Sequence, residues 1–194
     1  MGAVGLRDLT LTTYPWDEDR MEPDVDAACK TIREVEPKVA LFGQSVFLFP
    51  TPMKEMAAAA KEVGASVMYD GAHVLGLIAG GQFQDPLREG ADVMTGSSHK
   101  TFPGPQGGFL LSSSEDPAFH RKLNNAMFPG VCSSYHLHHV AGKVMALAEF
   151  KEYGAAYAKD IVANAQAFAA ALAGEGFDVL AESRGYTASH QVLT

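Results

Sequence analysis

Lys100 lies in a sequence context that is unusual for a lysine. It follows an apolar stretch and a short polar run, and residues 103–108 after it contain two prolines and three glycines. Most lysines keep a solvated ammonium group at the protein surface. A lysine held in a rigid turn and removed from water can instead lose its proton and serve as a nucleophile or form a Schiff base. Lys100 is therefore a candidate catalytic residue.

Asp70 and His73 form the second candidate group. Asp70 ends the apolar stretch VGASVMYD (63–70), which is typical of a buried strand, and His73 follows three residues later. A carboxylate in that position is costly unless a cation meets it. The protonated ring nitrogen of pyridoxal phosphate is such a cation, and the same coenzyme requires a lysine. Asp70 and Lys100 together therefore indicate pyridoxal-phosphate chemistry.

Both residues of this second group also have a simpler structural interpretation. Asp70 could cap a following helix, since aspartate is favoured at helix N-termini. His73 alone could be a core histidine. Their combination with Lys100 and the glycine-proline sequence favours the functional interpretation.

Helical and strand patterns alternate along the chain, as they must to place such side chains together. Helices are expected over 23–36, 52–64, 116–125, 135–152 and 155–174. Strands are expected over 6–16, 38–43, 65–70, 91–98, 107–113, 177–181 and 189–194. This alternation predicts an α/β fold with a mainly parallel sheet and helices on both faces.

Three of the predicted strands end in polar side chains. These are Gln44 and Ser45, Asp70 and His73, and the run from Ser97 to Lys100. Ligands of open α/β sheets bind at the carboxyl ends of the strands. We therefore expect all three groups to meet in one crevice.

The composition excludes several other classes of protein. The chain has 194 residues, is 47% hydrophobic and carries a formal net charge of −8 with scattered basic residues, so we expect no nucleic-acid partner. No apolar run has the length of a membrane span, and the first residues, MGAVGLRDL, lack the charged start and long apolar core typical of a signal peptide. Cys29 and Cys132 fit no disulfide or metal pattern. We expect a cytoplasmic protein without membrane contacts.

Three neighbouring histidines, His136, His138 and His139, raise the question of a metal site. His136 and His139 would share one face of a helix. Zinc sites combine histidines with cysteines or carboxylates at ligand spacing, and only Cys132 lies nearby. We expect the start of a helix beside a subunit interface here, and no metal.

The order and spacing of the motifs resemble the serine hydroxymethyltransferase (glycine hydroxymethyltransferase) family. The matching stretches are YDGAHVLGLIAGGQF (69–83), TGSSHKTFPGPQGGFLL (95–111), KLNNAMFPG (122–130) and HHVAGKVMAL (138–147). The resemblance implies the fold of aspartate aminotransferase, fold type I. It also implies that the chain is a central piece of a longer polypeptide. Residues 1–153 would belong to the large, coenzyme-binding domain, and residues 154–194 would form the connecting helix and the start of the small domain.

The resemblance also implies catalytic roles for the three residues introduced first. Lys100 would form the Schiff base with pyridoxal 5'-phosphate, and Asp70 would pair with the pyridine nitrogen. His73 would lie against the ring, near its phenolic oxygen and the substrate carboxylate. All three would thus be both catalytic and cofactor-binding.

Three further residues would complete the cofactor site by the same resemblance. Ser45 would contact the coenzyme near its phenolic oxygen, while Ser97 and His99 would position the lysine and the phosphate region. The family transfers a one-carbon unit between serine and tetrahydrofolate, giving glycine, and works as a homodimer with shared active sites. We expect that reaction here, with serine or α-methylserine as the amino acid.

The chain departs from the family pattern at three places. The glycine-rich loop after FPG is replaced by VCSSYHLHH (131–139), an arginine by Gln106 and a tyrosine by Phe47. These changes leave two alternatives open. One is a threonine-type aldolase or transaldolase acting on β-hydroxy amino acids, and the other is a catalytically silent homologue that serves as a binding or assembly partner.

Overall fold

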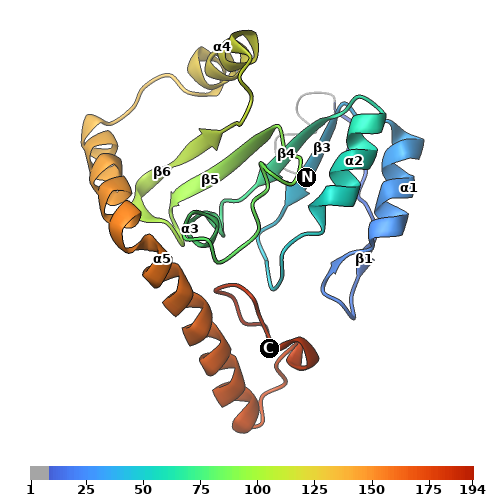
Figure 1. The fold of residues 1–194 in the computed structure, drawn as a ribbon, viewed down its shortest axis with the longest axis vertical. Coiled ribbons are helices and arrows are strands. Elements are labelled where there is room, and N and C mark those ends of the chain that lie inside the picture. The colour runs from blue at the N-terminus through green and yellow to red at the C-terminus, as the bar shows by residue number, and fades with distance from the viewer. Residues whose placement is uncertain (1–8) are drawn as a thin grey trace.

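The computed structural model describes residues 9–194, and its centre is a four-stranded sheet (Figure 1). In spatial order the strands are β3 (Val39–Gly43), β4 (Ser66–Asp70), β5 (Val93–His99) and β6 (Pro103–Leu111). β3, β4 and β5 are parallel to one another, and β6 is antiparallel to β5. The predicted α/β fold with a mainly parallel sheet is therefore confirmed.

Helices connect or follow these strands. They are α1 (Val25–Val35), α2 (Met53–Glu62), α3 (Leu75–Ala79), α4 (Pro117–Asn125) and α5 (Leu137–Gly174). The smaller elements are the β1–β2 hairpin (Trp16–Asp17 with Glu22–Pro23), the π-helical turn η2 (Ala126–Val131) and the 3-10 turn η3 (Glu182–Arg184). Asp24 and Asp116 are the N-cap residues of α1 and α4, and their side chains accept hydrogen bonds from backbone N–H groups of the first turn.

One face of the sheet forms the core. Phe42, Val67 and Tyr69 occupy alternate positions of β3 and β4 and are at most 1% exposed. The alanine-rich α2 packs on these two strands, because small side chains let a helix approach closely. On the opposite face of β3, Val39 and Leu41 are 54% and 49% exposed.

α3 and α5 pack on the same face as α2. By the pairing of the strands, Gly96 of β5 and Phe109 of β6 lie on the same face of the sheet as Tyr69 of β4. Leu75 of α3 lies directly over Gly96, and Phe150 of α5 reaches Phe109 through a cluster of aromatic rings. Of the two helical layers that the sequence predicts, residues 9–194 form the one on this face.

A single helix of 38 residues, α5, replaces the two helices predicted over 135–152 and 155–174. The predicted break near Gly154 is wrong, because glycine here serves packing instead of ending the helix. A Cβ atom added to Gly80, at the end of α3, would lie 2.7 Å from the backbone oxygen of Gly154 and 2.3 Å from the Cβ of Ala158. The two helices thus meet backbone to backbone.

Three of the predicted strands are wrong in the described residues. Residues 9–15 of the strand expected over 6–16 have no regular structure, and residues 6–8 lie outside the described part. The segments 177–181 and 189–194 are also irregular. The latter makes its hydrogen bonds largely through side chains that reach the loop after β3, so no ladder forms.

Candidate active site

Asp70 is the last residue of β4 and lies beside β5. Its Oδ1 accepts a hydrogen bond of 3.0 Å from the backbone N–H of Ala72 and lies 3.5 Å from the hydroxyl of Thr95. The first helix after it, α3, begins only at Leu75 and has no side-chain cap. The alternative interpretation of Asp70 as a helix cap is therefore wrong. The carboxylate is half-buried, and both of these contacts use Oδ1, so Oδ2 is available to another partner.

Lys100 lies in the tight connection of residues 100–102, because β5 ends one residue later and β6 begins four residues earlier than the sequence predicts. The neighbouring Thr101 ties this connection to the loop after β4. Its hydroxyl donates to the carbonyl of His73 at 2.8 Å and accepts from the N–H of Gly76 at 3.1 Å. Lys100 and His73 are thereby held on adjacent loops.

Lys100 and Asp70 lie close enough to His73 for their charges to act on its imidazole. Partial burial lowers the pKa of His73, and the ammonium group of Lys100 lowers it further, while the Asp70 carboxylate opposes both effects. His73 is thus favoured as the neutral imidazole. The structure therefore brings Asp70, His73 and Lys100 together at the carboxyl ends of β4 and β5, where ligands of such sheets bind.

Lys100 itself is exposed. The sequence predicts a lysine removed from water, and residues 9–194 do not provide that environment. The rigid connection is present, since the glycine- and proline-rich residues form the start of β6 at the edge of the sheet, where proline is tolerated.

The remaining predicted site residues lie on β5 and in the loop after β3. Ser97 is half-buried on β5, on the same face as Thr95 and Asp70. His99 is exposed, and its Nδ1 accepts a hydrogen bond of 3.4 Å from the N–H of Gly107. Ser45 is exposed in the loop after β3 and lines a groove of about 410 Å³.

His190 is a site residue that the sequence does not reveal. Its ring is stacked on that of His73, with 6.3 Å between the centroids and 18° between the planes. Burial lowers the pKa of His190, and the charges of His73 and Lys100 lower it further. Its Nδ1 is buried and has no hydrogen-bond partner among residues 9–194. Nothing in the sequence singles out His190, which lies in the segment 189–194 that the sequence predicts to be a strand.

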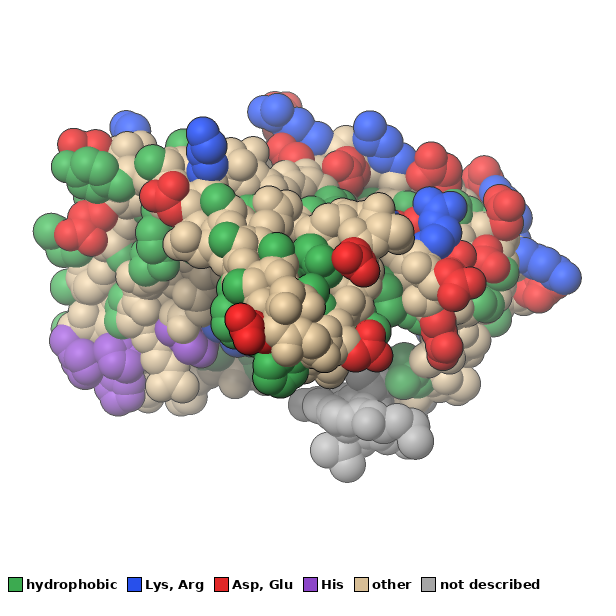
Figure 2. All heavy atoms as spheres, turned by 90° about the horizontal axis from the view of Figure 1, so that it is seen from below, with side chains coloured by type: hydrophobic (Ala, Val, Ile, Leu, Met, Phe, Trp, Pro, Cys, Tyr) green, Lys and Arg blue, Asp and Glu red, His purple; other side chains and the backbone are tan. Residues whose placement is uncertain are grey.

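The histidine cluster at the start of α5 lies elsewhere on the surface. Figure 2 shows histidine side chains gathered at one end of the face that it displays. The rings of His136, His138 and His139 lie 4.4–5.4 Å apart, centroid to centroid. No group of His, Cys, Asp or Glu side chains within residues 9–194 has an arrangement that could hold a metal ion. None of the helices in the same range has the length and hydropathy of a membrane-spanning segment.

Comparison with known proteins agrees with this fold. The family model for serine hydroxymethyltransferase matches residues 8–194. Serine hydroxymethyltransferases of Pyrococcus abyssi and Methanocella arvoryzae are 62% and 56% identical over 193 and 190 residues. These matches cover 99% and 98% of this chain but only 45% and 44% of the relatives. The chain thus spans somewhat less than half the length of the relatives that it matches.

A solved structure shares the fold. The L-threonine transaldolase from Pseudomonas fluorescens superposes with a TM-score of 0.91 at 30% sequence identity, covering 97% of this chain and 43% of that one. The architecture is that of the fold type I class of pyridoxal-phosphate-dependent transferases. Within that class, the chain belongs to the serine hydroxymethyltransferase family.

Proposed function

We propose that the protein carrying this chain is a pyridoxal-phosphate-dependent hydroxymethyltransferase. It would transfer a one-carbon unit between serine, or α-methylserine, and tetrahydrofolate, giving glycine or alanine. The observation that carries the proposal is the grouping of Asp70, His73 and Lys100 at adjoining strand ends. Membership of the serine hydroxymethyltransferase family supports it.

The residues of the site fit the coenzyme by their chemistry. An amine, a carboxylate and a neutral imidazole are the groups needed for covalent attachment, for a protonated ring nitrogen and for contact with the ring. Lys100 would hold the coenzyme through its amine, Asp70 would keep a proton on the ring nitrogen, and His73 would lie near the phenolic oxygen. When bound, the coenzyme supplies an electron sink for the carbanion at the α-carbon of glycine.

The outer residues would complete the binding of the coenzyme. Ser45 would contact the phenolic oxygen from the loop after β3. Ser97 and His99, which flank the lysine on β5, would position the amine and the phosphate region. The hydrogen bond between His99 and the N–H of Gly107 supports such a role, because it fixes the imidazole beside the connection that carries Lys100.

We also propose a homodimer with shared active sites. Large hydrophobic side chains are exposed on η2, at the start of α5 and in the segment between them, among them Val131, Tyr135 and Leu137 at 79%, 75% and 71%. Such a patch is typical of a protein interface. The division into residues 1–153 and 154–194, and a cytoplasmic location, also stay predictions.

One specific observation favours a second candidate function. The match to an L-threonine transaldolase supports an aldolase or transaldolase acting on β-hydroxy amino acids. Gln106 in place of an arginine is compatible with such a change of substrate. A catalytically silent homologue is the remaining alternative.

Two experiments on the full-length protein test these proposals. After reduction with borohydride, mass spectrometry is expected to find a pyridoxyl adduct on Lys100, absent in Lys100→Ala and retained in Lys159→Ala, which removes an exposed lysine of α5. An adduct on another residue contradicts the assignment, and no adduct at all favours the silent homologue. Turnover of serine and α-methylserine, with and without tetrahydrofolate, separates hydroxymethyl transfer from aldolase chemistry.

A further inference from the structure

Residues 187–191, here called the strap, run alongside the loop of residues 45–48 that follows β3. The N–H of Ala188 donates to the carbonyl of Leu48 at 2.8 Å, and the hydroxyl of Thr187 donates to the same oxygen at 3.3 Å. The hydroxyl of Ser189 donates to the carbonyl of Phe47. Although no strand forms here, the strap satisfies backbone groups of this loop that must find partners.

The side chain of Gln191 forms hydrogen bonds to the backbone of Ser45 and of Phe47. Its Oε1 accepts a hydrogen bond of 2.6 Å from the N–H of Phe47, and its Nε2 donates one of 2.9 Å to the carbonyl of Ser45. One carboxamide thus binds a carbonyl and an N–H two residues apart, as a neighbouring strand would. The side chain of Ser45 is exposed, so packing does little to fix this residue. The backbone hydrogen bonds to Gln191 hold it in place instead.

The strap also reaches the loop after β4. His190, the residue before Gln191, stacks on His73. Two consecutive residues of the strap therefore contact the two loops that carry Ser45 and His73. In the proposed function, those two side chains meet the same oxygen of the coenzyme.

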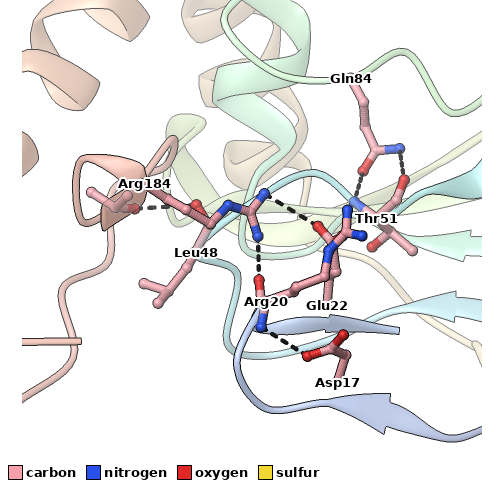
Figure 3. Close-up of polar contacts among 8 residues, drawn as sticks. Asp17, Arg20, Glu22, Leu48, Thr51, Gln84 and Arg184 are labelled. Carbon is pink, nitrogen blue, oxygen red and sulfur yellow. Dashed lines mark hydrogen bonds and ion pairs between the residues drawn. The ribbon is translucent and has the colours of Figure 1, made fainter. Parts of the chain in front are cut away.

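The strap is anchored away from the site by other contacts. The Nε2 of Gln166 in α5 donates to the carbonyl of Thr187 at 2.9 Å. Figure 3 shows the guanidinium group of Arg184 pointing to Glu22, at 3.2 Å, and to the carbonyl of Arg20. The same group lies 3.7 Å from the centroid of the Phe49 ring. These anchors hold the C-terminal segment to the domain without touching Ser45 or His73.

We propose that Gln191 is a positioning residue of the cofactor site, which fixes Ser45 relative to His73 through the strap. The proposal rests on the proposed function, in which Ser45 and His73 both contact the phenolic oxygen of the coenzyme and must therefore be correctly spaced. Loss of the carboxamide leaves the carbonyl of Ser45 and the N–H of Phe47 to water, so the loop can move while the rest of the strap stays anchored. Misplacement of a contacting group by about 1 Å is enough to weaken binding and catalysis strongly.

The test compares Gln191→Leu with Gln166→Leu in the full-length protein. Both variants remove a carboxamide that bonds to the backbone, but only Gln191 bonds to the Ser45 loop. Titration of the apo-protein with pyridoxal phosphate, followed by absorbance, is expected to show affinity reduced about tenfold or more in Gln191→Leu. In Gln166→Leu the affinity is expected to stay within about twofold of wild type.

A second measurement separates positioning from folding. Hydrogen exchange of the Phe47 amide is expected to be faster in Gln191→Leu than in wild type and unchanged in Gln166→Leu. Equal losses of affinity in both variants, or wild-type affinity in Gln191→Leu, would overturn the positioning role. If Gln191→Leu does not fold, Gln191→Asn, whose shorter side chain cannot span both contacts, gives the same test. The absence of an adduct on Lys100 in the wild-type protein would overturn the proposed function itself. The results on Gln191→Leu bear only on the positioning role, so failure of one proposal can be told from failure of the other.

Discussion

The hydroxyl of Thr101 donates a hydrogen bond of 2.8 Å to the backbone carbonyl of His73. This bond joins the residue after Lys100 to the loop that follows Asp70, across 28 positions of sequence. Thr101 is 7% exposed, so no water replaces the bond easily. Beyond the pairing of β4 with β5, this hydroxyl group therefore helps to fix the relative position of the candidate lysine and histidine.

Thr101→Val tests that dependence. The variant keeps the shape of the side chain but leaves the carbonyl of His73 and the N–H of Gly76 without their partner. We expect the free energy of unfolding of the full-length protein to fall by about 1–3 kcal/mol, measured by urea denaturation. Thr101→Ser, which keeps the hydroxyl, is the control and should lose less than half as much.

Gly76→Ala addresses the same junction from the other side. A Cβ at Gly76 would lie 2.2 Å from the backbone oxygen of Thr101, which cannot move without shifting the connection that carries Lys100. We expect a loss of stability of about 3 kcal/mol. Gly174→Ala is the matched control, because no side chain or distant backbone of the described residues lies within 4 Å of that Cβ. Thermal unfolding should show it to be neutral or slightly stabilising. Equal effects of the two substitutions would refute the close approach.

Asp70→Ala separates coenzyme binding from chemistry. The carboxylate would hold the proton on the ring nitrogen, whereas other groups would contribute most of the binding. Exchange of the α-proton of glycine, followed by NMR in the holoenzyme, is expected to slow at least about 100-fold. Retention of the coenzyme should change far less. Unchanged exchange in a protein that still binds the coenzyme would count against the role of Asp70.

The stacked pair of His73 and His190 predicts a dependence of stability on pH. Folding lowers the pKa of both residues below the ordinary value of about 6.5, by burial and by the charge of Lys100, against the weaker effect of Asp70 at His73. The unfolded chain therefore binds more protons, and stability decreases as the pH falls through about 6.5.

Urea denaturation of the apo-protein at pH 7.5 and 5.5 measures this dependence. His190→Phe keeps a stacked ring but cannot be protonated, so it should lose less stability between the two pH values than the wild type does. An equal loss in both proteins would show that the pair does not contribute.

The sequence predicts the four strands of the sheet and the strand ends that carry Asp70 and Lys100, because these depend on local patterns. Asp70 ends an apolar strand and Lys100 follows another, and parallel strands bring such ends to one edge. The contacts that fix the site are long-range and leave no local pattern. Neither the bond of Gln191 to Ser45, 146 positions away, nor the stacking of His190 on His73 could be predicted from the residues themselves.

The continuous helix α5 illustrates a second limit of prediction from local sequence. Glycine lowers helix propensity, which suggests a break near Gly154. The helix continues through a packed region: Gly80 of α3 lies against the backbone of Gly154, and a Cβ on Gly154 itself would meet the ring of Phe150. Tertiary packing overrides the local preference, and the surroundings that cause it are not visible in the helix sequence.

The contact between Ser45 and Gln191 also sets an order of assembly on the ribosome. The polypeptide is made from its N-terminus, so the loop after β3 leaves the exit tunnel long before the glutamine that holds it has been translated. Until then its carbonyl and N–H groups face water or a chaperone. Maturation of this corner of the molecule is therefore a late event, which follows synthesis of the whole of α5.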